Sequence, residues 1–240
     1  STPVKIFVSG KYAYVAGFSS DALAIIDISN PTYPILKSTV LTGSAPHDVK
    51  VVGRYAYVVN WSSANMVVID ISNPSVPRRV STTTVGANPK SIAISGRYAY
   101  IANRTDNNIS VVDISNPLAP IRIANADVGG NPFSVVVSGK YAYVANSGEN
   151  TMSVVDISNP HSPVQVNTVT VGSVPYTVFV SGNRAYTSNY NENSLSIIDI
   201  TDPTTPVWLA STTVGTGPDY IYVAGRYAYV TNEGNTLAIV

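Results

Sequence analysis

The chain has 240 residues, of which 45% are hydrophobic and 12% charged, with no cysteine and a formal net charge of zero. The absence of cysteine excludes disulfides and thiolate metal sites, and a neutral chain offers nothing to attract a polyanion. No apolar run reaches the roughly 18 residues of a membrane-spanning helix. We therefore expect neither nucleic-acid binding nor membrane insertion, and a single domain over residues 1–240.

An internal repeat dominates the sequence. A Gly-[Lys/Arg/Asn]-x-Ala-Tyr unit returns every 43 residues, and it begins at Gly10, Gly53, Gly96, Gly139, Gly182 and Gly225. An Asp-Ile pair follows the same spacing five times, from Asp27 to Asp199. Repeats of about 40–45 residues are typical of the blades of a β-propeller.

Each repeat contains the pattern of four short strands separated by turn residues. In the fourth repeat we expect strands over Phe133 to Val137, Tyr141 to Ala145, Met152 to Ile157 and Val164 to Val171, with Gly172 ending the last. Glycine, asparagine and proline separate these segments, and no helical periodicity is visible.

Two strand patterns favour a propeller over a β-solenoid. The third strand, for example Leu195 to Ile200, carries apolar residues on both faces, as a strand between two neighbouring sheets requires. The second strand alternates tyrosine with a small residue, as at Tyr98 to Ile101, so that large side chains can meet small ones on the next blade. We predict a six-bladed, all-β propeller of 43-residue, four-stranded blades.

The segments Tyr143 to Asn146 and Tyr229 to Asn232 read Tyr-Val-Ala-Asn and Tyr-Val-Thr-Asn, and the segment Ser153 to Pro160 ends in Asp-Ile-Ser-Asn-Pro. These segments resemble the YVTN repeats of surface-layer propellers and the LVIVD repeat. The resemblance extends over the whole chain and implies a propeller fold with export or display at the cell surface. It implies no reaction.

The last blade lacks its fourth strand in this sequence. Three outcomes stay open: a three-stranded blade with an exposed edge, a strand supplied by another molecule, or a sequence cut from a longer chain. The second outcome predicts self-association through the open edge of blade six.

Two loop positions per repeat vary, whereas the turns at the other end of each blade stay nearly constant. After the second strand the variable residues include Phe18, Trp61, Arg104 and Tyr190; after the proline that begins the first strand they include His47, Lys90, Phe133, Tyr176 and Asp219. We expect these nine residues to form a variable face, with the second set near the mouth of the central channel. Exposed aromatic residues and arginine mark binding surfaces.

No catalytic or metal-binding motif occurs, so we expect no cofactor, no metal and no enzymatic activity. The repeated aspartates from Asp27 to Asp199 are expected to accept hydrogen bonds from their own turns. The basic residues that recur after the hairpin glycine, such as Lys11 and Arg54, are expected to lie in solvated turns, with an anion site as the alternative. The loop acids Asp106, Glu149 and Glu192 lack the spacing of a calcium site.

These observations predict an exported or cell-surface scaffold that binds a protein or carbohydrate through its variable face. The chain carries no signal peptide, so export implies one that was removed or that lies outside this sequence. Two alternatives stay open. One is a structural subunit of a surface layer, sheath or filament; the other is an enzyme at the channel mouth, where His47, Lys90, Tyr176 and Asp219 could do acid–base work.

Overall fold

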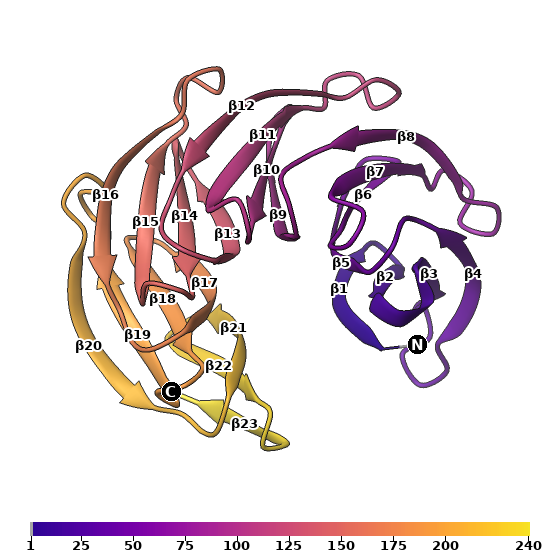
Figure 1. Cartoon of the computed structure of the whole chain (residues 1–240). Helices are drawn as coiled ribbons and strands as arrows, with labels where there is room; N and C mark the ends of the chain where they lie inside the picture. The colour runs from indigo at the N-terminus through magenta and orange to yellow at the C-terminus, as the bar shows by residue number, and fades with distance from the viewer. Residues whose placement is uncertain (1) are drawn as a thin grey trace. The chain divides into compact units, whose positions relative to one another are not determined.

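The computed structural model describes residues 2–240 and confirms a six-bladed β-propeller in which five blades have four strands and the last has three. Each blade is a twisted antiparallel sheet whose strands are neighbours in chain order (Figure 1). Among these residues the only helix is the three-residue 3₁₀ turn η1 (Phe18–Ser20). None is long and apolar enough to cross a membrane.

The strands recur at the repeat spacing. Blades one to three contain β1 (Pro3–Ser9), β2 (Tyr12–Gly17), β3 (Ala22–Asp27), β4 (Ile35–Leu41), β5 (Pro46–Val52), β6 (Tyr55–Asn60), β7 (Asn65–Asp70), β8 (Arg78–Thr84), β9 (Pro89–Ser95), β10 (Tyr98–Asn103), β11 (Asn108–Asp113) and β12 (Ile121–Asp127). Blades four to six contain β13 (Pro132–Ser138), β14 (Tyr141–Asn146), β15 (Thr151–Asp156), β16 (Val164–Thr170), β17 (Pro175–Ser181), β18 (Arg184–Asn189), β19 (Ser194–Asp199), β20 (Val207–Thr213), β21 (Pro218–Ala224), β22 (Tyr227–Asn232) and β23 (Thr236–Ile239). The strands expected for the fourth repeat are therefore correct to within one residue at each end.

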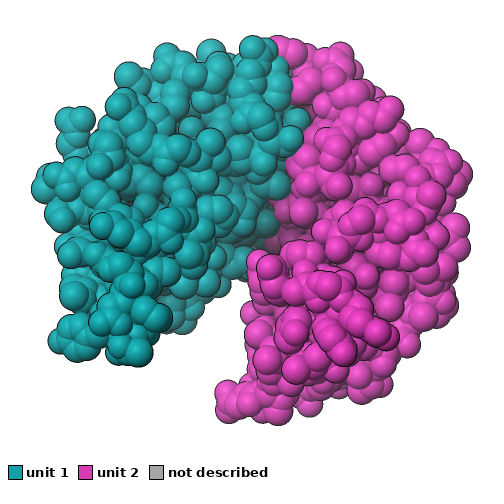
Figure 2. All heavy atoms as spheres, turned by 180° about the vertical axis from the view of Figure 1, so that it is seen from behind, with its two compact units in different colours: residues 1–106, 110–123 teal, residues 107–109, 124–240 magenta. Residues whose placement is uncertain are grey.

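The chain divides into two compact units, coloured separately in Figure 2. Unit 1 comprises residues 1–106 and 110–123, and unit 2 comprises residues 107–109 and 124–240. The expectation of a single domain stays a prediction. Unit 1 has eleven Lys and Arg and six Asp, a net charge of +5, whereas unit 2 has three basic and eight acidic residues, a net charge of −5. The net charge of zero for the whole chain is therefore the sum of a basic unit 1 and an acidic unit 2.

The core lies between neighbouring blades and is built by the predicted large-to-small matching. In unit 1 the ring of Tyr14 lies in one cluster with Ala56, and that of Tyr57 in the next cluster with Ala99. Tyr143 with Ala185 continues the series in unit 2. The third strands contribute from both faces, as predicted: Met66, Val67, Val68 and Ile69 of β7 are all fully buried. Such interdigitation gives close packing between twisted sheets.

The hairpin between the first and second strands turns at the repeated glycine. Gly10, Gly53, Gly96, Gly139, Gly182 and Gly225 have φ between 56° and 60°, a region in which glycine lacks the steric penalty of other residues. This explains why the Gly-[Lys/Arg/Asn]-x-Ala-Tyr unit is the steadiest part of the repeat.

A second glycine serves close packing between repeats. The second strands of blades two to six end in a buried asparagine, at Asn60, Asn103, Asn146, Asn189 and Asn232. A glycine in the loop that leads into each of these blades lies against the amide; a Cβ at Gly86 would come within 2.5 Å of Asn103 Cγ. The amide of Asn103 donates to Ser110 Oγ at 2.8 Å and so ties β10 to the start of β11. This contact fixes the loop end of the blade.

Candidate functional site

The two variable positions of each repeat lie side by side at one end of the blade. In blade two Pro46 pairs with Asn60, which places His47 and Trp61 at adjacent strand ends. The Trp61 amide donates to the Ala45 carbonyl at 2.8 Å. The equivalent bonds are Arg104 to Asn88, Ser147 to Asn131, Tyr190 to Val174 and Glu233 to Gly217, at 2.9–3.1 Å. The nine predicted residues therefore occupy loops that are built alike.

These loops are held by residues in the left-handed region. Ala45, Asn88, Asn131 and Val174, each directly before the proline, have φ between 51° and 58°. The Ala45 amide donates to Asp21 Oδ1 at 2.8 Å, and the Val174 amide to Asn150 Oδ1 at 2.8 Å. Asparagine tolerates this region readily, whereas a β-branched valine does not. Val174 is thus strained, and the variable side chains project from a fixed backbone.

Unit 1 gathers five of the nine predicted residues into what we call the basic cluster: Phe18, His47, Trp61, Lys90 and Arg104. The ring centroids of Phe18 and His47 are 6.3 Å apart, and those of His47 and Trp61 are 6.0 Å apart. Lys90 Nζ lies 4.1 Å from the Trp61 ring centroid, and Arg104 Cζ 5.7 Å from it. Both are cation–π distances. All five side chains are half-buried, so they combine a wide apolar surface with two positive charges.

Lys90 fixes the tautomer of His47. Lys90 Nζ lies 2.8 Å from His47 Nε2, and His47 Nδ1 lies 2.8 Å from the Lys90 carbonyl oxygen. An ammonium group can only donate, so Nε2 accepts and Nδ1 carries the proton that it donates to the carbonyl. Burial, followed by the charge of Lys90, lowers the pKa of His47 to about 4. The imidazole is therefore neutral at physiological pH.

A buried carboxylate lies beneath this pair. Asp48 is 1% exposed and accepts from the amides of Val49 at 2.8 Å and Ile92 at 3.0 Å. Its Oδ1 also lies 3.8 Å from Lys50 Nζ. The Asp48–Ile92 bond joins blade two to blade three inside unit 1, so the strands that carry His47 and Lys90 are fixed relative to each other. Sequence reasoning missed this role, although Asp48 follows His47 directly.

Unit 2 stacks three of the remaining predicted residues. Phe133 and Tyr176 have ring centroids 4.2 Å apart with planes 4° from parallel, and Tyr176 and Tyr190 are 4.4 Å apart at 21°. We call this set the aromatic stack. Its rings are half-buried and come from β13, β17 and the loop after β18. Stacked rings of this kind stabilise each other beyond their buried area.

Acidic groups border the aromatic stack. The Tyr190 hydroxyl donates to Glu233 Oε2 at 2.5 Å. This hydrogen bond, with smaller contributions that include the charges of Glu233 and Asp219, raises the pKa of Tyr190 to about 12. Asp219 itself is exposed. Glu233 was not among the predicted site residues, although it occupies the same repeat position as Tyr190 and Arg104 and could have been found from that register.

The repeated aspartates at the other end of the blades bond to their own turns, as predicted. The aspartates accept from the backbone amide two residues on, for example Ser72 N to Asp70 Oδ1 at 2.9 Å and Ser158 N to Asp156 Oδ1 at 2.8 Å. Arg54 and Arg97 each lie with Cζ 5.1 Å from the centroid of the adjacent tyrosine ring.

The loop acids also have structural partners. Asp106 accepts from the Ala87 amide at 2.9 Å, and Glu192 from the Ser173 amide at 2.8 Å. Within residues 2–240 no group of three or more His, Cys, Asp or Glu side chains could hold a metal ion.

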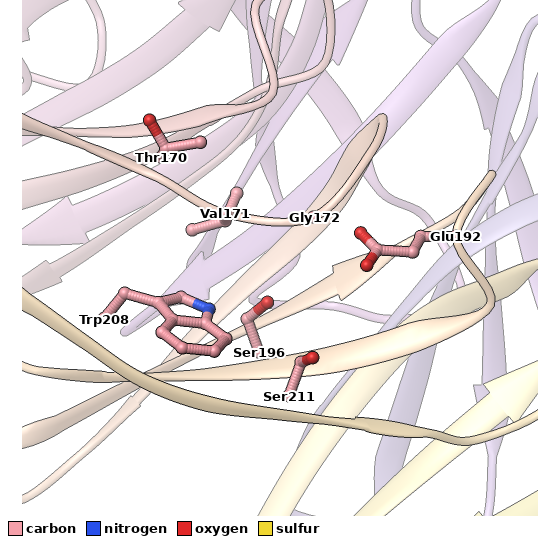
Figure 3. A pocket seen from close by; sticks show the side chains of 7 residues that line it. All are labelled: Thr170, Val171, Gly172, Glu192, Ser196, Trp208 and Ser211. Carbon is pink, nitrogen blue, oxygen red and sulfur yellow. The ribbon is translucent and has the colours of Figure 1, made fainter.

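A pocket of about 370 Å³ in unit 2 lies outside the predicted positions. Figure 3 shows Trp208 on one side and Glu192 on the other, with Ser196 and Ser211 between them. Thr170, Val171 and Gly172 complete the lining. Trp208, one of the two tryptophans in the chain, is 46% exposed. Because we compared only loop positions, a residue in a fourth strand escaped the sequence analysis.

The 43-residue period, the four-stranded sheets and the packing between blades define a repeat β-propeller. The model of the LVIVD repeat matches six times, at residues 4–42, 43–84, 86–128, 129–171, 176–214 and 219–240. The chain belongs to the LVIVD repeat family. No curated protein matches it in sequence.

Solved structures agree in fold. A protein from Bacteroides uniformis, provisionally described as a 6-phosphogluconolactonase, is 17% identical with a TM-score of 0.87; the match covers 98% of this chain and 79% of that one. The periplasmic gluconolactonase of Pseudomonas aeruginosa is 16% identical at 0.80, over 99% and 73%. A functionally unknown protein from Desulfotomaculum acetoxidans is 16% identical at 0.79, over 98% and 84%. At these identities the similarity establishes the fold alone.

Proposed function

We propose that the protein is a non-catalytic binding module, exported or displayed at the cell surface, that binds a glycan or a protein through its variable loops. The observation that carries this proposal is the clustering of half-buried aromatic rings at those loops, in the basic cluster and again in the aromatic stack. Aromatic side chains on a rigid backbone give contact area at low entropic cost.

The two clusters favour different parts of a ligand. The aromatic stack, with Glu233 and Asp219 beside it, suits a sugar ring, because the outer faces of stacked rings can contact C–H groups while carboxylates accept from hydroxyls. The basic cluster suits an acidic group, because Lys90 and Arg104 are both held near Trp61. Arg104 Nε is buried and has no hydrogen-bond partner in the described structure.

A glycan and peptide array followed by NMR shift mapping tests the proposal. We expect a ligand to shift loop residues around Tyr176 or Lys90, and Tyr176→Ala or Lys90→Met to weaken its binding at least tenfold. Lys140→Met, at the hairpin end of blade four, and Tyr33→Ala, at an exposed turn, are the matched controls. A ligand that shifts only hairpin residues, or that binds the loop variants and the parent equally, contradicts the proposal.

A structural subunit is the second candidate, and exposed apolar side chains in blade six favour it. Leu237 and Ile239 of β23 are 57% and 59% exposed, whereas the equivalent Leu23 and Ile25 of blade one are fully buried. β23 also pairs on one side only. Light scattering over a wide concentration range separates the candidates. A particle mass that rises with concentration in the parent protein but not in Leu237→Glu supports assembly through blade six. A monomer at every concentration contradicts the structural-subunit candidate.

An enzyme is the third candidate, because two solved structures with a similar fold carry gluconolactonase names. In unit 1 the neutral His47 could accept a proton only after Lys90 moves from Nε2. Hydrolysis of a gluconolactone panel that is lost in His47→Ala would favour this candidate over a binding module.

A further inference from the structure

The pocket beside Trp208 has an internal counterpart three repeats earlier in unit 1. At the spacing of 43 residues, Trp208, Val171 and Ser211 correspond to Arg79, Thr42 and Thr82. In that counterpart the guanidinium group of Arg79 occupies the site. Its Nη1 donates to the Thr42 carbonyl at 2.8 Å, and its Nη2 and Nε donate to Thr82 Oγ1 at 2.6 and 3.1 Å.

Trp208 replaces this arginine and leaves the acceptors without their donor. The backbone carbonyl remains, now at Val171, and the hydroxyl remains at Ser211. Neither receives a hydrogen bond from a side chain within the part of the chain that the structure describes. Both residues line an open pocket instead of contacting a guanidinium group. An indole face also attracts a guanidinium group, through stacking and cation–π interaction.

Three other lining residues are more polar or acidic than their counterparts. Leu41, Ser63 and Val67 of the counterpart become Thr170, Glu192 and Ser196. Glu192 adds a carboxylate opposite the indole, at the far side of the pocket in Figure 3. One of its oxygens accepts from the Ser173 amide, and a carboxylate can accept further hydrogen bonds. The whole unit carries a net charge of −5, which attracts a cation to this site.

From this comparison we propose that the pocket lined by Val171, Glu192, Trp208 and Ser211 binds the guanidinium group of an arginine side chain on a partner protein or peptide. The ligand replaces the group that Arg79 supplies within unit 1. A space of about 370 Å³ suits one side chain better than an extended oligosaccharide. This site shares the loop after β18 with the aromatic stack but is lined by other residues, so it goes beyond the proposed function and can hold if that proposal fails.

Fluorescence gives a local measurement, because Trp61 and Trp208 are the only tryptophans. In a Trp61→Phe variant the emission of Trp208 is recorded while Nα-acetyl-arginine methylamide is added. We expect a saturable change in the millimolar range. The citrulline analogue, which has a similar shape without the charge, should give none. Glu192→Gln should weaken binding about two- to fivefold, as for the loss of an exposed ion pair.

Trp208→Arg supplies the decisive variant, since its own guanidinium group should occupy the pocket as Arg79 does. In the parent protein the arginine analogue should shift the amide NMR signals of Val171 and Ser211. In Trp208→Arg the signals should start displaced and stay unchanged on titration. Equal responses to arginine and citrulline, a response to sugars alone, or undiminished binding in Trp208→Arg would overturn the proposal.

Discussion

Lys90 and His47 hold each other through two hydrogen bonds, one from the ammonium group to the ring and one from the ring to the Lys90 carbonyl. The two residues are 43 positions apart and occupy the same place in adjacent blades. Their pairing gives the imidazole one tautomer and one charge state.

The first prediction concerns the titration of that imidazole. In a His161→Gln background, NMR should report a pKa of about 4 for His47, because burial and Lys90 disfavour its charged form. An unfolded histidine titrates near about 6.5. The unfolded chain therefore binds the proton more readily, and the fold loses stability as pH falls from about 6.5 towards 4. Lys90→Met should raise the pKa of His47; titration near 6.5 in the parent protein would contradict the geometry.

A second prediction addresses the strained residue before Pro175. Val174 has a φ of 55°, whereas its equivalent in blade four is Asn131 at 51°. Val174→Asn should raise the free energy of unfolding by about 1 kcal/mol, since asparagine avoids much of the left-handed penalty. Urea denaturation measures the change. The converse exchange, Asn131→Val, should lower stability, and an unchanged midpoint in both variants would show that the strain is relieved elsewhere.

The turn aspartates predict that the free energy of unfolding falls at acidic pH. Hydrogen bonds from the side chain and backbone of Ser158 lower the pKa of Asp156, and Ser72 does the same for Asp70. A folded pKa below the unfolded value gives stability that is present above about pH 4 and is lost as pH falls through the folded pKa. Asp156→Asn should flatten part of that loss in urea titrations between pH 5 and pH 2. If the free energy of unfolding of the variant falls with pH as steeply as that of the parent protein, groups other than Asp156 cause the loss of stability.

The close approach of Gly86 to Asn103 yields a fourth prediction. Gly86→Ala places a methyl group against the buried amide and should destabilise the protein by about 1–3 kcal/mol. Blade one has Gly17 at the position of the asparagine, so Asn103→Gly removes the obstacle. The double variant should be more stable than the sum of the two single changes predicts. If denaturant unfolding shows that the two losses in free energy of unfolding simply add, the contact between Gly86 and Asn103 is not the cause of the destabilisation in Gly86→Ala.

The sequence predicted the fold well because the repeat shows the same pattern six times. Strand ends, the alternation of Tyr57 with Ala99 across a junction, and the turn role of Asp70 all followed from local chemistry and register. The site was predicted only as a set of positions. Whether Lys90 points to His47 or to solvent depends on rotamers and on burial between blades. Trp208 was overlooked because only loop positions were compared; the repeat spacing aligns it with Arg79, but only the structure shows the hydrogen bonds that Arg79 makes.

The glycine–asparagine contact has a consequence for how such a chain can change in length. Gly43 meets Asn60, Gly86 meets Asn103, and the pairing recurs to Gly215 and Asn232, always between the loop that enters a blade and the end of that blade's second strand. A 43-residue segment that begins at such a glycine therefore carries both partners of one contact. Duplication or deletion of such a segment by recombination would therefore leave every glycine–asparagine contact of the remaining blades intact.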